Sequence, residues 1–216
     1  MKKIGVMLSG CGVFDGAEIH EATLTLLSLD QQGAQAVCMA PDMTFDEVDH
    51  LTKQPTGKQR NVLNESARIA RGNILNAKDV NAHDIDALIF PGGFGAAKNL
   101  SDFAIKGPDA SVHPEIQRIL NEMIASKKPI GAICIAPATV AKALASYQVN
   151  VTIGNDPGTA QAIEKTGAKH TQCSVDNICI DETNNIITTP AYMLGPGIKD
   201  VAIGIEKLVT EVIQRA

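Results

Sequence analysis

The sequence contains no tryptophan, and aromatic residues make up only 3% of it. It also lacks a basic cluster, and its net charge is −5. Proteins whose main partner is nucleic acid or an anionic membrane carry a concentrated positive surface. The charge pattern therefore excludes both partners. Hydrophobic residues still make up 44% of the chain, so we expect a core built from alanine, valine, isoleucine and leucine.

Long apolar runs and paired cysteines are also missing. No apolar run reaches the roughly 18 residues of a membrane-spanning helix. The opening residues "MKKIGVMLSG" are too short in their apolar part for a signal peptide, so we expect a first strand there. The five cysteines are dispersed, odd in number and without a C-x-x-C pair: Cys11, Cys38, Cys134, Cys173 and Cys179. This pattern is typical of reduced thiols and predicts a cytoplasmic protein.

The length of 216 residues suits a single α/β domain spanning 1–216. Apolar runs predict strands at 3–8, 34–40, 85–93, 129–134 and 149–154, and a hairpin or paired strands at 177–181 and 185–190. Helical spacing covers 18–32, 61–71, 113–126, 135–146, 157–166 and 198–214, and the polar stretch 41–61 is predicted to be a loop. Continuous apolar strands that alternate with helices indicate a mostly parallel sheet with helices on both faces. Ligands bind such sheets beyond the carboxyl ends of the strands, which directs attention to the loops that begin at Ser9, Pro91 and Cys134.

Cys134 ends a predicted strand and passes into a predicted helix with almost no loop. A turn this sharp projects its central side chain from the end of the sheet, as the nucleophile elbow of hydrolases does for serine. The positive end of the following helix is expected to lower the pKa of the thiol. The alternative is a buried cysteine that packs as a small hydrophobe. The spacing alone leaves both interpretations open.

Gly92 and Gly93 lie where the predicted strand 85–93 ends. Glycine permits positive φ angles and close backbone approach. The amides of these two residues, together with that of Ile135, could donate to an oxyanion. The alternative is an ordinary glycine turn. The stretch is not a P-loop, because the pattern G-x-x-x-x-G-K-[ST] is absent.

Glu18 and Glu21 lie three residues apart and share one face of the first predicted helix. A carboxylate there could hold a nearby thiol by a hydrogen bond or move its proton. The alternative is that these acids only favour the positive end of the helix. Cys11 could serve as a second, resolving thiol or be an inert loop residue. His20 is expected to face away from Glu21, which makes it a poor candidate for a base.

The remaining histidines do not predict a catalytic pair. His113 lies in an H-P-E segment like that of class I glutamine amidotransferases, but in those enzymes the histidine follows the cysteine, whereas His113 precedes Cys134. A helix start with Pro114 in its first turn explains the segment. After Cys134 the only histidine is His170, in a polar segment. No histidine has zinc-ligand spacing, and we expect neither a metal nor a cofactor.

Four stretches in this order resemble the DJ/PfpI superfamily: "SGCGVFDGAEIHEA", "FPGGFGAAKNL", "GAICIAPA" and "TTPAYMLGPGIKDVAIGIEKLV". Within it, the chain is similar to the bacterial ElbB family, so-called isoprenoid biosynthesis proteins with a glyoxalase activity. The resemblance implies a flavodoxin-like α/β three-layer sandwich of the class I amidotransferase type, usually a homodimer. It places the reactive cysteine at Cys134 and the carboxylate that contacts it at Glu21, with Glu18 as second choice. It places the oxyanion amides at Gly93 and Ile135, with Gly92 as a further candidate.

The sequence also departs from the broader superfamily pattern. Protease-like and chaperone-like members carry histidine directly after the cysteine, where this chain has Ile135. Many others place a histidine after the next strand, where this chain has Gly154 and Asn155. Both departures argue against peptidase activity and leave a cysteine–glutamate pair.

The elbow and the family resemblance together predict a cofactor-independent glyoxalase that converts glyoxal, or another small 2-oxoaldehyde, into the 2-hydroxy acid. Cys134 would attack the aldehyde to form a hemithioacetal, and Glu21 would move a proton between the two carbons. An alternative from a different class is a redox-sensing or regulatory protein that uses an oxidisable Cys134. A third interpretation, an amidotransferase subunit, is disfavoured because the histidine and glutamate are missing downstream.

Overall fold

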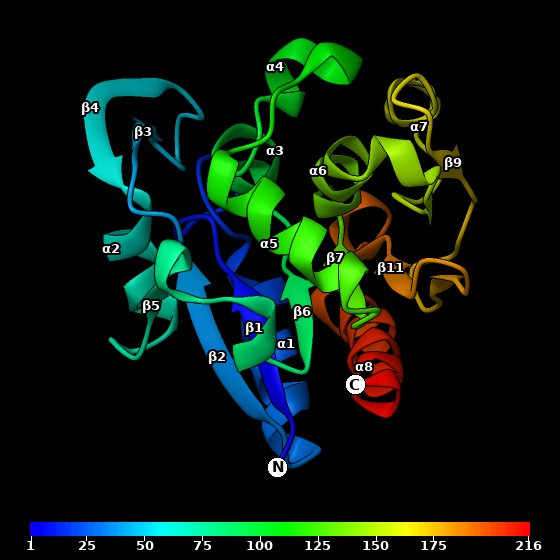
Figure 1. Cartoon of the computed structure of the whole chain (residues 1–216). Helices are drawn as coiled ribbons and strands as arrows, with labels where there is room; N and C mark the ends of the chain where they lie inside the picture. The colour runs from blue at the N-terminus through cyan, green and yellow to red at the C-terminus, as the bar shows by residue number, and fades with distance from the viewer.

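The computed structural model describes all 216 residues and has the flavodoxin-like α/β sandwich that the sequence predicts. Its central sheet has seven strands in the order β10-β11-β7-β6-β1-β2-β5 (Figure 1). The strands are β1 (Lys3–Met7), β2 (Gln35–Ala40), β5 (Leu75–Asn76), β6 (Ala87–Phe90), β7 (Ile130–Ile133), β10 (Cys179–Asp181) and β11 (Ile186–Thr189). All neighbours pair in parallel except β10 and β11, which form the predicted antiparallel pair.

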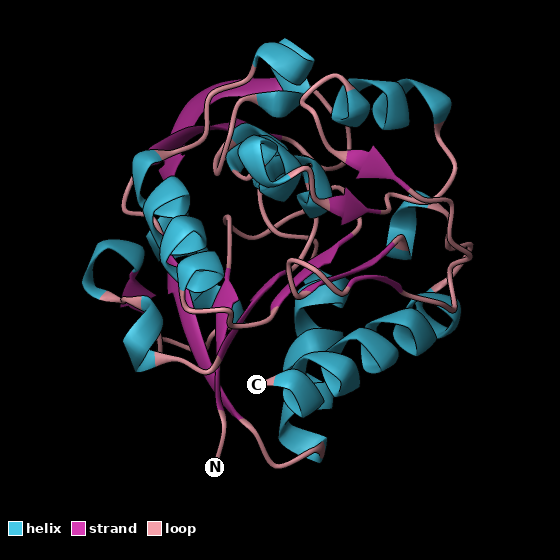
Figure 2. Ribbon diagram, turned by 45° about the vertical axis from the view of Figure 1, so that its right-hand side comes forward, coloured by secondary structure: helices cyan, strands magenta, loops and turns pink.

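Helices cover both faces of this sheet, as Figures 1 and 2 show. The helices are α1 (Ile19–Gln31), α2 (Val62–Ile69), α3 (Phe94–Lys98), α4 (Phe103–Lys106), α5 (Pro114–Ala125), α6 (Ala136–Ala143), α7 (Pro157–Glu164) and α8 (Ile198–Arg215). Short 3-10 helices are η1 (Ala77–Asp79), η2 (Ala82–Asp84), η3 (Gly107–Asp109), η4 (Ala145–Tyr147) and η5 (Ala191–Met193). None of the helices is long and apolar enough to cross a membrane.

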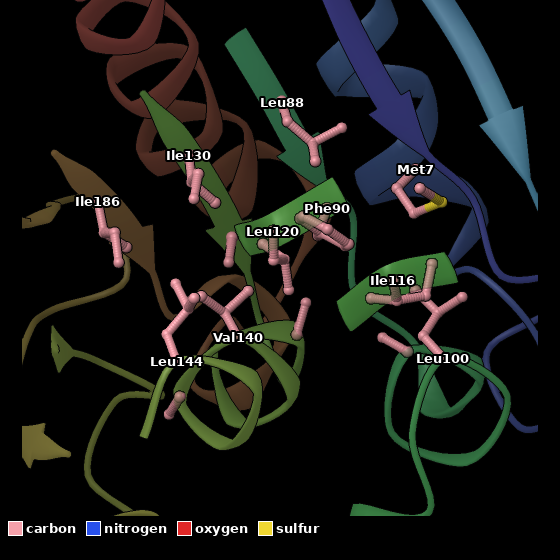
Figure 3. Packing of buried hydrophobic residues seen from close by; sticks show 14 of the residues in the cluster. Met7, Leu88, Phe90, Leu100, Ile116, Leu120, Ile130, Val140, Leu144 and Ile186 are labelled. Carbon is pink, nitrogen blue, oxygen red and sulfur yellow. The ribbon is translucent and has the colours of Figure 1, made fainter. Parts of the chain in front are cut away.

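The core has two halves, one on each side of the sheet. On one side α1 and α8 bury residues such as Leu29 and Leu208 against the sheet. On the other side α5 and α6 do the same, and Figure 3 shows Leu120 and Val140 packed toward Phe90. Because both faces are covered, the central strands are apolar along their whole length rather than alternating.

The prediction of a loop over 41–61 is wrong. This segment contains an antiparallel hairpin of β3 (Thr44–Val48) and β4 (Pro55–Asn61), with an irregularity in register between Asp46 and Val48. Nearly all of β4 is exposed, so no apolar alternation marks it as a strand. Polar contacts across the hairpin help to hold it, such as the 3.2 Å bond from Gln59 to Asp46.

Two further segments differ from the prediction. The strand predicted at 149–154 is only β8 (Asn150–Val151), which pairs with β9 (Lys169–His170) in a separate two-stranded sheet. The region after β6 contains α3 and α4, which are too short to show helical periodicity in the sequence. Both helices lie beyond the carboxyl edge of the sheet, where the loops after β1, β6 and β7 meet (Figure 1).

Candidate active site

Cys134 occupies the turn between β7 and α6. Its φ angle is +62°, a left-handed value that is strained for any residue other than glycine. Its N–H donates to the Thr189 carbonyl at 2.9 Å, and the next residue, Ile135, is the N-cap of α6. Pro137 in the first turn of the helix is compatible with so abrupt a start. The backbone therefore has the geometry of a nucleophile elbow, with the cysteine side chain at the end of the sheet.

Gly92 and Gly93 bring the loop after β6 against the other two loops. A Cβ atom on Gly92 would collide with the Cβ of Cys134 and with a carboxyl oxygen of Glu21. A Cβ on Gly93, whose φ is +93°, would collide with the backbone around Glu18. Only glycine at both positions lets these backbones approach so closely. The interpretation of Gly92 and Gly93 as an ordinary glycine turn is therefore incomplete, because both glycines allow the loops of the site to pack together.

Glu21 is the carboxylate that faces the cysteine. It lies in the first turn of α1 and is completely buried. One carboxyl oxygen accepts the N–H of Gly92 at 3.0 Å and the other accepts the N–H of Tyr192 at 3.2 Å. The carboxyl oxygen that accepts from Gly92 and the Cβ of Cys134 both lie against the Cα of Gly92, so the carboxyl group and the cysteine side chain are neighbours. Glu18 instead caps α1, because its carboxylate accepts the N–H of Glu21 at 2.8 Å.

Burial dominates the proton affinities of this pair. It raises the pKa of Glu21 to about 8, although the amides of Tyr192 and Gly92 and the thiol of Cys134 oppose the shift. Burial, followed by the charge of Glu21, also raises the pKa of the Cys134 thiol well above its usual value. The expectation of a thiol activated by a lowered pKa is therefore wrong, because desolvation outweighs the helix end. The two groups titrate as a unit, and the first proton leaves from the carboxyl near pH 8.

Two backbone amides act on the proton affinity of the sulfur. The N–H groups of Gly93 and Ile135 favour the charged thiolate and partly oppose the rise in the pKa of Cys134. A carbonyl carbon bonded to this sulfur would carry its oxygen beside the same amides, which is the arrangement of an oxyanion hole. The amide of Gly92 is already used by Glu21. Of the three amides that the sequence suggested, two are therefore available to substrate.

Asn99 supports the site, and the sequence analysis missed its role. It is buried at the end of α3, and its amide nitrogen donates to the carbonyls of Ser9 and Asp15, both at 2.8 Å. These bonds fasten the glycine-rich loop after β1 to the segment that carries Gly93. The only signal in the sequence was its place in the quoted "FPGGFGAAKNL" stretch, which does not reveal a long-range contact.

The structure also places the other candidate residues. Cys11 lies partly exposed in the loop after β1, near the charges of Glu65 and Arg68, and burial raises its pKa. His20 is half-exposed, and its Nδ1 lies 2.7 Å from the hydroxyl of Tyr192. It therefore turns from Glu21 toward η5.

Two further histidines, His113 and His170, have structural roles. His113 caps α5 by accepting the N–H of Glu115 at 3.3 Å, so the prediction of a helix start at Pro114 is confirmed. His170 accepts the N–H of Ile153 at 3.3 Å and lies in the small sheet of β8 and β9. Neither histidine contributes to the cysteine–glutamate pair.

Residues 11–192, which include the elbow, the glycine pair and Glu21, match the model of the DJ-1/PfpI family. The chain belongs to the DJ-1/PfpI family. The resemblance that the sequence motifs indicated is thereby confirmed.

Individual relatives extend this likeness over the whole chain. The human protein named glutamine amidotransferase-like class 1 domain-containing protein 3, mitochondrial, is 44% identical over 98% of this chain and 82% of its own length. A crystal structure from Ehrlichia chaffeensis, titled isoprenoid biosynthesis protein with amidotransferase-like domain, is 36% identical with a TM-score of 0.93. It covers 100% of this chain and 99% of its own.

A more distant solved structure is glyoxalase III from Candida albicans. It aligns with a TM-score of 0.63 over 99% of this DJ-1/PfpI chain and 97% of its own, at 17% identity. At that identity the likeness establishes a shared fold and not a shared reaction.

Proposed function

We propose that this DJ-1/PfpI protein is a glutathione-independent glyoxalase, a lyase of the hydro-lyase type, which converts glyoxal and water into glycolate. The main support is the buried carboxyl of Glu21 against the thiol of Cys134 at a strained elbow. That pair combines a nucleophile with a group that can take up and return a proton. The shared fold with a fungal glyoxalase III is consistent with the proposal.

The first step forms a bond between sulfur and carbon. The Glu21 carboxylate takes the thiol proton while the sulfur of Cys134 attacks one aldehyde carbon of glyoxal. The carbonyl oxygen gains negative charge beside the amides of Gly93 and Ile135. Glu21 then returns its proton to that oxygen, which gives a hemithioacetal and restores the carboxylate.

The second step moves hydrogen from one carbon to the other. Glu21 removes the C–H proton of the hemithioacetal carbon, and the electron pair forms an enediolate with the neighbouring aldehyde. The proton is delivered to the second carbon, and the hydroxyl proton on the first carbon passes to the oxygen on the second. The product is a glycolyl thioester on Cys134, formed with no external oxidant.

The third step releases the acid. Water adds to the thioester carbon, and the tetrahedral oxygen again lies beside the amides of Gly93 and Ile135. The carbon–sulfur bond breaks, the sulfur recovers a proton, and glycolic acid leaves and ionises. The raised thiol pKa of Cys134 agrees with activation by Glu21 at the moment of attack. It also argues against the redox-sensor alternative, because peroxides oxidise the thiolate form.

The cellular setting belongs to the same proposal. We propose a homodimer in the cytoplasm, with a small aldehyde as substrate. All five cysteines are free thiols, which suits a reducing compartment.

Glycolate formation from glyoxal tests the proposal directly. Wild-type protein, Cys134→Ser and the matched control Cys173→Ser are incubated with ¹³C-labelled glyoxal, and glycolate is quantified by NMR. We expect turnover by the wild type and the control, and a loss of at least about 100-fold in Cys134→Ser. Equal rates for the wild type and Cys134→Ser would refute the nucleophile, and no glycolate from the wild type would refute the reaction.

A further inference from the structure

An apolar cavity of about 320 Å³ lies beside the elbow. Two glycines, Thr159 and six hydrophobic residues line it. The hydrophobic residues are Phe94, Ala97, Phe103, Ala104, Ile135 and Ala162. The mechanism above uses none of these side chains. The volume lies at the lower end of the range for small-molecule pockets, so it suits a compact group rather than a large ligand.

Two residues that line the cavity are neighbours, along the chain, of residues at the reacting centre. Ile135 follows Cys134 directly and Phe94 follows Gly93, so these two wall residues are part of the oxyanion site or next to it. The other walls come from α4 and α7, which contact α3 and α6 respectively. Figure 1 shows these four helices gathered beyond the carboxyl edge of the sheet. The cavity therefore shares Ile135 with the oxyanion site and borders that site at Phe94.

The lining decides which substituent fits. No charged side chain contributes to it and Thr159 is its one polar side chain, so a carboxylate or phosphate would lose hydration and gain at most one side-chain hydroxyl donor. An apolar group would instead gain by leaving water. Phe94 and Phe103 supply aromatic surface, and an aromatic ring can pack against such rings by its edge or an offset face. A hydrogen atom or methyl group would leave most of this surface unfilled.

We propose that this cavity is a substrate subsite for the aryl or branched alkyl group of a substituted 2-oxoaldehyde. The identity of the aldehyde rests on the proposed function, whereas the presence of an apolar subsite beside Cys134 does not. With phenylglyoxal, the sulfur attacks the aldehyde carbon and the phenyl group on the second carbon enters the subsite. Addition of one water then gives mandelate, with all atoms accounted for.

The first test compares phenylglyoxal with glyoxal. Ala104→Phe narrows the cavity from an exposed position on α4, and Ile105→Phe places the same ring on the adjacent residue, which does not line the cavity. In the wild type we expect kcat/KM for phenylglyoxal to exceed that for glyoxal by about tenfold or more. The ratio should fall toward unity in Ala104→Phe and persist in Ile105→Phe. A ratio that is equal in all three proteins overturns the subsite.

The second test does not require turnover. Cys134 is alkylated with iodoacetamide and with 2-iodo-N-phenylacetamide, and the rate at this residue is followed by peptide mass spectrometry. Relative to free cysteine, we expect the phenyl reagent to be favoured by about tenfold in the wild type and Ile105→Phe, but not in Ala104→Phe. Phenyl selectivity without aldehyde turnover would refute the glyoxalase and support the subsite. No phenyl selectivity in the wild type would refute the subsite whatever the turnover.

Discussion

Replacing Glu21 by glutamine should change how the stability of the protein depends on pH. The pKa of Glu21 is raised from its usual 4.5 to about 8 in the folded protein. Between pH 4.5 and pH 8 the Glu21 carboxyl keeps its proton in the folded state, whereas the same carboxyl has released it in the unfolded state. The stabilising effect of that proton is complete below pH 4.5 and is lost as the pH rises through the folded value. Glu21 thus makes the wild type less stable at pH 8 than at pH 5.

The size of the effect follows from the shift. Between pH 5 and pH 8 the unfolded carboxyl is ionised while the folded one is largely protonated. Each pH unit over this range costs the folded state about 1.4 kcal/mol, or about 4 kcal/mol in all. A glutamine in place of Glu21 cannot ionise, so the variant does not lose this stability as the pH rises. Its amide accepts from only one of the two N–H groups that Glu21 binds, which lowers stability by about 1–3 kcal/mol at every pH.

Urea unfolding at pH 5, 6, 7 and 8 measures the difference. The free energy of unfolding of wild type minus that of Glu21→Gln should fall by about 4 kcal/mol from pH 5 to pH 8. The exposed residue Glu206 provides the control, and Glu206→Gln should follow the wild type at every pH. If the curves of wild type and Glu21→Gln run parallel, Glu21 is not a buried carboxyl with a raised pKa.

Three further substitutions test the packing of the site. Gly92→Ala should reduce stability by about 1–3 kcal/mol and abolish glycolate formation, because the added Cβ collides with Cys134 and Glu21. The control is Gly197→Ala, whose added Cβ meets only a side-chain oxygen at 3.5 Å, and it should change neither stability nor glycolate formation. Asn99→Ala should cost about 2–4 kcal/mol in urea unfolding, because two buried carbonyls lose their donor; a cost near zero would show that these bonds are dispensable. Cys134→Gly should be more stable than Cys134→Ala by about 1 kcal/mol, the reverse of the usual order, because φ is +62°. If thermal unfolding shows alanine to be the more stable, the turn is not strained.

Local sequence was enough to predict the elbow and the approximate sheet. The apolar run before Cys134 and the helix-compatible residues after it are adjacent in the chain, so the turn follows from neighbours alone. The parallel sheet follows from continuous apolar strands, which need cover on both faces. The hairpin over β3 and β4 was missed because its strands are polar and exposed. Its polar contacts join residues whose pairing the local pattern does not specify.

The electrostatics of the site could not be read from local sequence. The helix start after Cys134 is visible in the chain and suggests a lowered thiol pKa. The burial that reverses this, and the charge of Glu21 that adds to it, come from residues distant in the chain, because Glu21 and Gly92 pack around Cys134. For the same reason the position of Glu21 came from family resemblance rather than periodicity, because Glu18 lies on the same helical face. The structure separates the two by making Glu18 the helix cap.

The pH dependence of glycolate formation by wild-type and Glu21→Gln protein tests the cysteine–glutamate mechanism most directly. If the Glu21 carboxylate takes the proton of Cys134, the wild-type rate should rise about tenfold per pH unit and level off near the Glu21 pKa of about 8. Glu21→Gln should be slower by at least about 100-fold at pH 8 and lack this inflection. Profiles of the same shape and height in both proteins would contradict the mechanism.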